Sequence, residues 1–167
     1  MDQINNSRSA TVITCYYKVK SKHSFEEYAK WIKNFLYILQ ANLIIFTSAD
    51  MAESLKELAM QNRTQSGANK NIKIIIRELH DLEPVKRYQN IWEDQYGKDP
   101  TRQIRTKECY MIWNSKMSLV AEAIAINPFG SDKFVWNDIG SLRDSRYATE
   151  HCAELAHYPR YDVISAD

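Results

Sequence analysis

The chain has 167 residues, which is enough for one domain with a sizeable core. With 44% hydrophobic and 26% charged residues, its composition is that of an ordinary globular protein. The formal net charge of +1 creates no overall field that would attract nucleic acid or an anionic membrane, so we expect neither as a partner. No apolar run approaches the roughly 20 residues that span a bilayer. The polar residues 1–10 are predicted to be a short lead-in without a signal peptide.

Three cysteines, Cys15, Cys109 and Cys152, lie far apart in the sequence. Their odd number and the lack of a Cys-x-x-Cys pair argue against a disulfide framework and against a zinc knuckle. His151 and His157 lie near Cys152, but this spacing matches no common metal site. We therefore expect reduced thiols and a cytoplasmic location.

Three segments in the first half of the chain have the pattern of strands. Residues 11–17 and 42–47 are rich in β-branched and aromatic side chains that fall on both faces of a strand, a pattern typical of parallel strands that are covered on both sides. Residues 72–76, Ile-Lys-Ile-Ile-Ile, are predicted to be a third strand.

Two predicted helices separate these strands. Ser24, with a glutamate three residues later, forms a capping box that predicts a helix from residue 25 to about residue 40. Asp50, again with a glutamate three residues later, predicts a second helix over about 51–62, followed by a polar loop over 63–71. Strands and helices that alternate at this spacing indicate right-handed crossovers and a parallel sheet.

The middle of the chain is predicted to contain one amphipathic helix. Pro84 interrupts the chain, and residues 88–96 then have a helical pattern with Ile91 and Trp92 directed inward. Residues 97–103 contain Gly, Pro and polar side chains, so we expect a loop there.

The last predicted elements are a helix and a strand. A helix over about 115–126 has an apolar stripe formed by Met117, Val120, Ala121 and Ile124, and Asn127-Pro128 ends it. Residues 133–136 follow as a fourth strand, and residues 137–140 form the turn at its carboxyl end.

These elements predict one α/β domain over residues 11–167, with a doubly wound, mainly parallel sheet. In an open parallel sheet, ligands bind beyond the carboxyl ends of the strands. Four predicted strand ends meet at that edge, namely residues 14–17, 47–50, 77–78 and 137–140. Asp138 therefore lies where such a sheet binds its ligands.

Asp138 has two interpretations. Its carboxylate can hold a divalent ion or a hydroxyl of a ribose or sugar. Alternatively, it is a turn residue, since Asn-Asp-x-Gly is good turn chemistry. Gly140 fits both interpretations, because glycine permits positive φ and lets a ligand approach the backbone closely. Lys116 lies one helix earlier and either pairs with a diphosphate or is a solvated surface lysine.

Other basic and aromatic residues also have two interpretations. Lys18, Lys20 and Lys22 alternate after the first strand and form either a phosphate-facing edge or a charged edge that discourages strand association. Tyr16 and Tyr17 either stack on a base or pack in the core. The sequence contains no Gly-rich phosphate loop, no Gly-x-Ser-x-Gly elbow and no His-Glu-x-x-His motif.

Five stretches of the chain resemble the bacterial HtrL/YibB-like proteins. They are TVITCYYKVK, EYAKWIKNFL, ANLIIFTS, YMIWNSKMSLVAEAI and NPFGSDKFVWNDIG, and they cover about residues 10–143 in the family's order. The last stretch is the most specific. These proteins in turn resemble the wider group of GT-A-type nucleotide-sugar glycosyltransferases.

The resemblance implies a GT-A fold with a donor site. In that group the fourth strand ends in an Asp-x-Asp motif that holds Mn²⁺ or Mg²⁺ and the donor's ribose or diphosphate. Asp138 occupies the first acidic position, while Gly140 replaces the second, which weakens the expectation of a metal because hard divalent ions favour several oxygen ligands. The donor-binding residues implied in this way are Thr14, Cys15, Tyr16, Thr47, Asp50, Lys116, Asn137, Asp138 and Gly140, with Asp138 as the metal ligand.

The function implied by the resemblance is transfer of a sugar from a nucleoside diphosphate to a hydroxyl acceptor, such as a glycan. Enzymes of this group normally continue into an acceptor domain, so we expect the chain to be the donor-binding half or a reduced member. Asp144 is the nearest candidate for a catalytic base. Two alternatives stay open: a non-catalytic nucleotide-binding or protein-interaction module, and an unrelated doubly wound nucleotide-binding or hydrolase domain.

Overall fold

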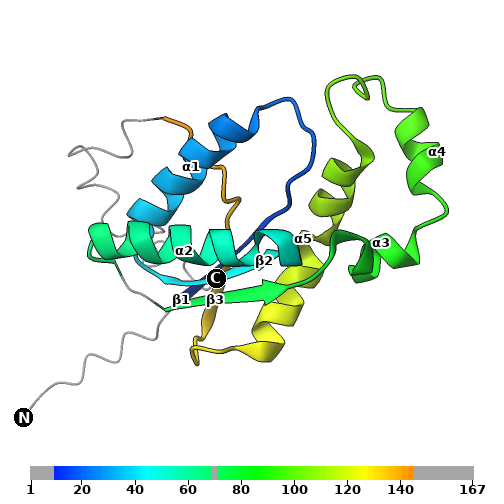
Figure 1. The fold of residues 1–167 in the computed structure, drawn as a ribbon. Helices are drawn as coiled ribbons and strands as arrows, with labels where there is room; N and C mark the ends of the chain where they lie inside the picture. The colour runs from blue at the N-terminus through cyan, green and yellow to red at the C-terminus, as the bar shows by residue number, and fades with distance from the viewer. Residues whose placement is uncertain (1–9, 69–70, 145–167) are drawn as a thin grey trace, which may run out of the picture.

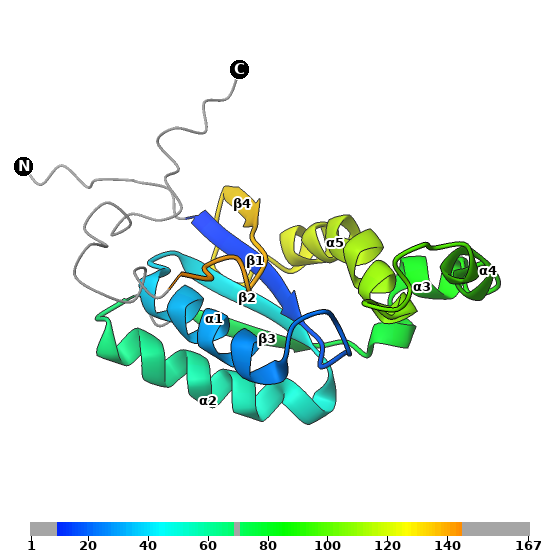
Figure 2. The same ribbon diagram turned by 90° about the horizontal axis from the view of Figure 1, so that it is seen from above.

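A computed structural model describes residues 10–68 and 71–144 and contains one four-stranded sheet. The strands, all parallel and in the order β3-β2-β1-β4, are β1 (Ala10–Tyr16), β2 (Asn42–Thr47), β3 (Ile72–Ile76) and β4 (Lys133–Trp136). Helices α1 (Phe25–Ile38) and α2 (Ala49–Gln65) cover one face, and α5 (Lys107–Ile126) covers the other (Figure 1, Figure 2). The predicted doubly wound parallel α/β fold is confirmed.

Most of the predicted lead-in and the C-terminal part of the predicted domain lie outside the described residues. Ala10, which was predicted to end the lead-in, instead begins β1 and is buried. Residues 1–9 and 145–167 are not described, so the predictions for His151, Cys152 and His157 lie outside the described residues. No helix in the described part of the chain is both long and apolar enough to cross a membrane.

Each face of the sheet packs against its own apolar cluster. Because successive residues of a strand point to opposite faces, Val12 packs with α1 and α2, whereas Ile13 packs with α5. The first cluster contains Phe35 and Leu36 of α1, and the second contains Leu119 of α5. The central strands β1 and β2 are therefore buried on both sides, which explains their continuous apolar runs.

The predicted capping box starts α1, but the prediction for α2 is wrong in detail. The Glu27 N–H donates to Ser24 Oγ at 3.2 Å, and the Ser24 N–H donates to Glu27 Oε2 at 2.8 Å. Helix α2 begins directly after Ser48, so Asp50 lies in the first turn, where its charge favours the helix dipole, and does not cap the helix. Helix α2 continues to Gln65 instead of ending at residue 62, and it buries Asn62 and Arg63 in its last turn.

Short helices replace the single helix predicted over 88–96. They are η1 (Leu79–Asp81), α3 (Glu83–Arg87) and α4 (Trp92–Gly97). Pro84 lies in the first turn of α3, where its missing N–H leaves no helical hydrogen bond unmade, so it starts a helix there. Residues 88–91 form turns, and Ile91 is exposed, contrary to the prediction. Trp92 is half-buried, and its Nε1–H donates to the backbone of α3 at 3.0 Å.

Helix α5 begins at Lys107, well before the predicted start at residue 115. Its buried residues are Cys109, Met111, Ser115, Leu119 and Ala123. The predicted stripe lies largely on the other side, since Met117 and Ile124 are 74% and 48% exposed. Helix α5 carries apolar side chains of its own on all sides, so the spacing of apolar residues alone does not identify the buried face. The helix ends as predicted at Asn127, which adopts a left-handed φ of 34°.

A polar cluster joins the strands at the amino edge of the sheet. The buried hydroxyls of Ser131 and Thr11 share a hydrogen bond of 2.7 Å, and Asn42 Nδ2 donates to Ser131 Oγ at 3.2 Å. Asn71 Nδ2 in turn donates to Asn42 Oδ1 at 3.0 Å. Residues at the amino ends of all four strands are thus connected, on the edge opposite to the one expected to bind ligands.

Candidate functional site

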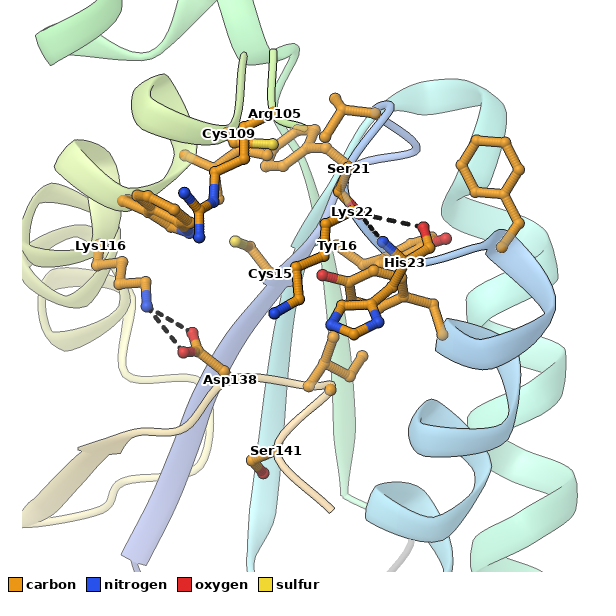
Figure 3. A pocket seen from close by; sticks show the side chains of 18 of the residues that line it. Cys15, Tyr16, Ser21, Lys22, His23, Arg105, Cys109, Lys116, Asp138 and Ser141 are labelled. Atoms are coloured by element: carbon orange, nitrogen blue, oxygen red, sulfur yellow. Dashed lines mark hydrogen bonds and ion pairs between the residues drawn. The ribbon is translucent and has the colours of Figure 1, made fainter. Parts of the chain in front are cut away.

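A cavity of about 470 Å³ opens at the carboxyl edge of the sheet, between α1 and α5 (Figure 3). Its walls come from the end of β1, the loop that leads to α1, the first half of α5 and the turn that follows β4. β1 is followed by α1 on one face, whereas its neighbour β4 is preceded by α5 on the opposite face. This arrangement is a topological switch point, where doubly wound sheets bind their ligands.

Asp138 forms an ion pair with Lys116 on the α5 side of the cavity (Figure 3). Lys116 Nζ lies 2.7 Å from Oδ1 and 2.9 Å from Oδ2 of the carboxylate. Trp136 Nε1–H donates to Asp138 Oδ1 at 2.9 Å, and the ammonium lies 5.6 Å from the centroid of the Trp136 ring. Both carboxylate oxygens therefore face a donor, and the pair joins α5 to the end of β4.

Positive charge dominates the cavity. The cationic lining residues are Lys22, Arg105, Lys116 and Arg143, against the one carboxylate of Asp138 among the described lining residues. The Arg105 guanidinium lies 5.6 Å from the centroid of the Trp113 ring, and that of Arg143 lies 4.6 Å from the Trp31 ring. Neither arginine forms an ion pair with a carboxylate of residues 10–68 or 71–144. Since the whole chain carries only +1, this concentration of charge is local.

Aromatic rings form the α1 side of the cavity. The rings of Tyr16, His23 and Tyr28 line this side, and the buried ring of Trp31, which is not a lining residue, packs behind them. His23 Nδ1 lies 3.7 Å from Glu27 Oε1, and His23 Nε2 lies 3.5 Å from Arg143 Nη1. A hydrogen on Nδ1 suits both neighbours, because it faces the carboxylate and leaves the Nε2 lone pair toward the guanidinium.

The missing side chain of Gly140 makes room for these rings. A Cβ atom at this position would lie 3.1 Å from Tyr28 Cε1, 3.3 Å from Tyr28 Cδ1 and 3.5 Å from Trp31 Cε3. Among the described glycines, positive φ occurs at Gly67 and Gly130 and not at Gly140. The glycine is therefore explained here by close packing against an aromatic ring and not by backbone conformation.

Two unpaired thiols, Cys15 and Cys109, also line the cavity and are buried. Burial, with a smaller contribution from the Asp138 carboxylate, raises the pKa of the Cys15 thiol to about 12, although nearby Lys116 acts in the opposite direction. Cys109 Sγ donates to the carbonyl oxygen of Lys20 at 3.5 Å. Since the thiolate is the nucleophilic form, Cys15 is a packing residue at neutral pH.

The structure brings together five of the residues that the sequence predicted for a donor site. Those that line the cavity are Cys15, Tyr16, Lys116, Asp138 and Gly140. Four others, Thr14, Thr47, Asp50 and Asn137, are not lining residues.

The four remaining residues have positions that explain this difference. Thr14 and Thr47 are fully buried within the sheet, and the Thr47 hydroxyl donates to a backbone carbonyl of β1 at 2.6 Å. Asp50 lies at the start of α2, where it accepts a hydrogen bond from Ser48. The Asn137 N–H donates to β1 at 3.0 Å and so extends the β1–β4 ladder. Asp144, the candidate base, is also absent from the described lining, and its carbonyl accepts a hydrogen bond from α1.

Tyr28, Arg105 and Arg143 line the cavity but were not predicted to be site residues. Tyr28 lies in the first turn of α1, Arg105 lies just before α5, and Arg143 follows the turn after β4. Their positions in the chain could have indicated the site, because each residue lies close to a strand end or to the start of a helix at the ligand-binding edge of the sheet. Lys22 and His23 lie in the loop after β1, and their positions gave the same indication.

The described side chains do not fit Mn²⁺ or Mg²⁺ well. Within residues 10–68 and 71–144, no group of three or more His, Cys, Asp or Glu side chains is placed to hold a metal ion. Asp138, the predicted ligand, directs its oxygens to Lys116 and Trp136. Hard divalent ions favour several oxygen ligands, so one carboxylate that is paired with an ammonium group is a poor donor set.

Comparison with known proteins places the chain in a family. A family model described as "Bacterial protein of unknown function (HtrL_YibB)" matches residues 8–152, which include every described strand and helix and the whole described lining of the cavity. No curated protein and no solved structure matches the chain. The chain therefore belongs to the HtrL/YibB family of bacterial proteins, as its motifs had indicated.

Proposed function

We propose that the chain binds a nucleotide sugar in this cavity and transfers the sugar to a hydroxyl acceptor, in the manner of GT-A-type glycosyltransferases. The observation that carries the proposal is a strongly cationic cavity with an aromatic wall at the switch point of a parallel sheet. The rings on the α1 side suit a base or a sugar, and the cations suit a diphosphate.

The chemistry of the leaving group explains why these cations matter. When a sugar leaves a nucleoside diphosphate, negative charge develops on the departing diphosphate. Cations that are already in place stabilise this charge without reorganisation in the transition state. Arg105 and Arg143 are positioned by their contacts with indole rings, while Lys116 adds a flexible point charge.

The acceptor's proton needs a base, and His23 is the described lining residue that suits this role best. Imidazole is the commonest general base. The position of His23 between Glu27 and Arg143 favours the tautomer that has a lone pair on Nε2, and that lone pair is released to the acceptor hydroxyl when Arg143 turns to the diphosphate. Asp138, the other basic group in the lining, is engaged by Lys116 and Trp136.

A thermal-shift panel of UDP-, GDP- and TDP-sugars, with CMP-sugars that lack the second phosphate, tests the proposal. A ligand that binds only the native state stabilises it by about 2.7 kcal/mol at one hundred times its Kd. We expect one diphosphate donor to raise the Tm of the wild type, and to raise that of Lys116→Ala much less. The matched control is Lys56→Ala, which removes an exposed lysine of α2 outside the cavity.

Two outcomes contradict the proposal at different points. If no donor raises the Tm, the cavity is not a donor site. If a donor binds but no nucleoside diphosphate is released in the presence of a broad panel of hydroxyl acceptors, then transfer is wrong and the non-catalytic nucleotide-binding module is the better description.

A further inference from the structure

Lys116 occupies the position that a divalent cation would need at Asp138. Its ammonium lies 2.7 Å and 2.9 Å from the two carboxylate oxygens, and Trp136 donates to one of them. The carboxylate is therefore already neutralised by a cation that belongs to the chain itself. A metal ion at Asp138 would first have to displace Lys116.

The surroundings of the pair also oppose a metal ion. Lys22, Arg105 and Arg143 line the same cavity as Lys116, so a divalent ion would be placed among like charges. Within the described residues, no second carboxylate of the lining offsets them. The same charges attract a diphosphate, and within the described residues neither Arg105 nor Arg143 forms an ion pair with a carboxylate that would compete with it; Arg105 donates to Thr101 Oγ1 at 3.0 Å and interacts with Asp99 only at longer range.

We propose that the cavity holds the donor's diphosphate through Lys116, Arg105 and Arg143 without a divalent cation, an inference that rests on the proposed function above. On binding, the flexible Lys116 moves its ammonium from Asp138 to the phosphate oxygens. Asp138 stays hydrogen-bonded to Trp136 and becomes an acceptor for a hydroxyl of the ribose or sugar. The carboxylate thus holds Lys116 in place in the empty cavity and contributes to specificity in the occupied one.

Isothermal titration with inorganic pyrophosphate and with uridine and guanosine diphosphates tests this inference, in EDTA and then in Mn²⁺. In EDTA we expect binding by the wild type that is weakened about tenfold or more in Lys116→Met, because a charge-assisted contact is lost. Methionine keeps the apolar stem, so the variant should fold, and circular dichroism and a thermal melt check this.

Asp138→Asn separates the two roles of the carboxylate. If Asp138 competes with the ligand for Lys116, then Asp138→Asn binds pyrophosphate in EDTA as tightly as the wild type, or up to about fivefold more tightly. The matched control is Asp81→Asn, which removes a carboxylate that is paired with Lys86 at 2.8 Å outside the cavity and should leave the affinity unchanged.

The other outcomes overturn the inference in distinguishable ways. Binding that requires Mn²⁺ and is lost in Asp138→Asn overturns metal-free binding and leaves the proposed function intact. If neither pyrophosphate nor the two nucleoside diphosphates bind in EDTA or in Mn²⁺, and the donor panel also fails, the inference and the proposed function fall together.

Discussion

Replacing Gly140 by alanine tests whether the glycine serves packing or a ligand. The added Cβ would lie 3.1 Å and 3.3 Å from two ring carbons of Tyr28, so the half-buried ring must shift by a few tenths of an ångström. Overfilling a packed site typically costs about 1–3 kcal/mol, and the lower end applies to a ring that can move toward solvent. Alanine also lowers the conformational entropy of the unfolded chain relative to glycine, which offsets about 0.4–1 kcal/mol of the packing cost. We expect Gly140→Ala to lower the free energy of unfolding by no more than about 0.6 kcal/mol.

A double-mutant cycle with Tyr28 isolates the cause. In Tyr28→Ala the two ring carbons are gone, so Gly140→Ala should become neutral or stabilising by about 0.4–1 kcal/mol. Tyr28→Phe is the matched control, because it keeps both ring carbons and should preserve the cost. Urea denaturation followed by circular dichroism gives the free energies. If Gly140→Ala changes the free energy of unfolding by the same amount in the wild type and in Tyr28→Ala, within about 0.5 kcal/mol, then packing is not the reason for this glycine.

Two further predictions concern the opposite edge of the sheet and the buried thiol. Ser131→Ala removes the hydroxyl that bonds Thr11 and Asn42, so urea denaturation should show a loss of about 1–3 kcal/mol, while titration shows unchanged affinity for pyrophosphate; weaker binding without a loss of stability would contradict this. Cys15 keeps its proton in the folded state up to about pH 12 but loses it near pH 9 when unfolded, so its contribution is full below about pH 9 and is lost as the pH rises toward 12. Stability should fall by up to about 1.4 kcal/mol per pH unit above pH 9, and less steeply in Cys15→Ala, as measured by urea denaturation at pH 8, 9 and 10.

The elements that sequence predicted well are those in which one local signal decides the structure. The runs of β1 and β2 are apolar on both faces, β3 is rich in β-branched residues, and the Ser24 capping box and Asn127-Pro128 mark helix ends chemically. The start of α5 was missed because its first two turns mix polar and apolar residues, and because the packing of α3 and α4 decides which side is buried. The predicted start of α2 was wrong because an acidic residue such as Asp50 suits both the N-cap and the first turn of a helix.

The site was predictable where it depends on strand ends and not where it depends on loops. Asp138 lies two residues after the end of β4, and the parallel pairing of β4 with β1 brings the ends of these two strands together. Arg105 and Arg143 lie in irregular segments that are held by side chains from other elements, with Tyr96 Oη donating to the Arg105 carbonyl and Asn34 Nδ2 donating to the Leu142 carbonyl. Both Lys116 and Asp138 were implicated separately, but their pairing depends on the crossing of α5 over the sheet, which local patterns do not encode.

The pairing of β1 with β4 also determines when the cavity can exist. Ile13 lies opposite Trp136, so nearly the whole described chain is enclosed between the two strands. Closing a loop of this length costs on the order of 4 kcal/mol of chain entropy, and contacts that are so distant in sequence form slowly. The β1–α1–β2 unit has no such delay, yet it supplies the aromatic side of the cavity and only one of its four cationic lining residues, Lys22. During refolding, affinity for an anionic ligand should therefore return with the docking of β4, later than the helical circular dichroism signal.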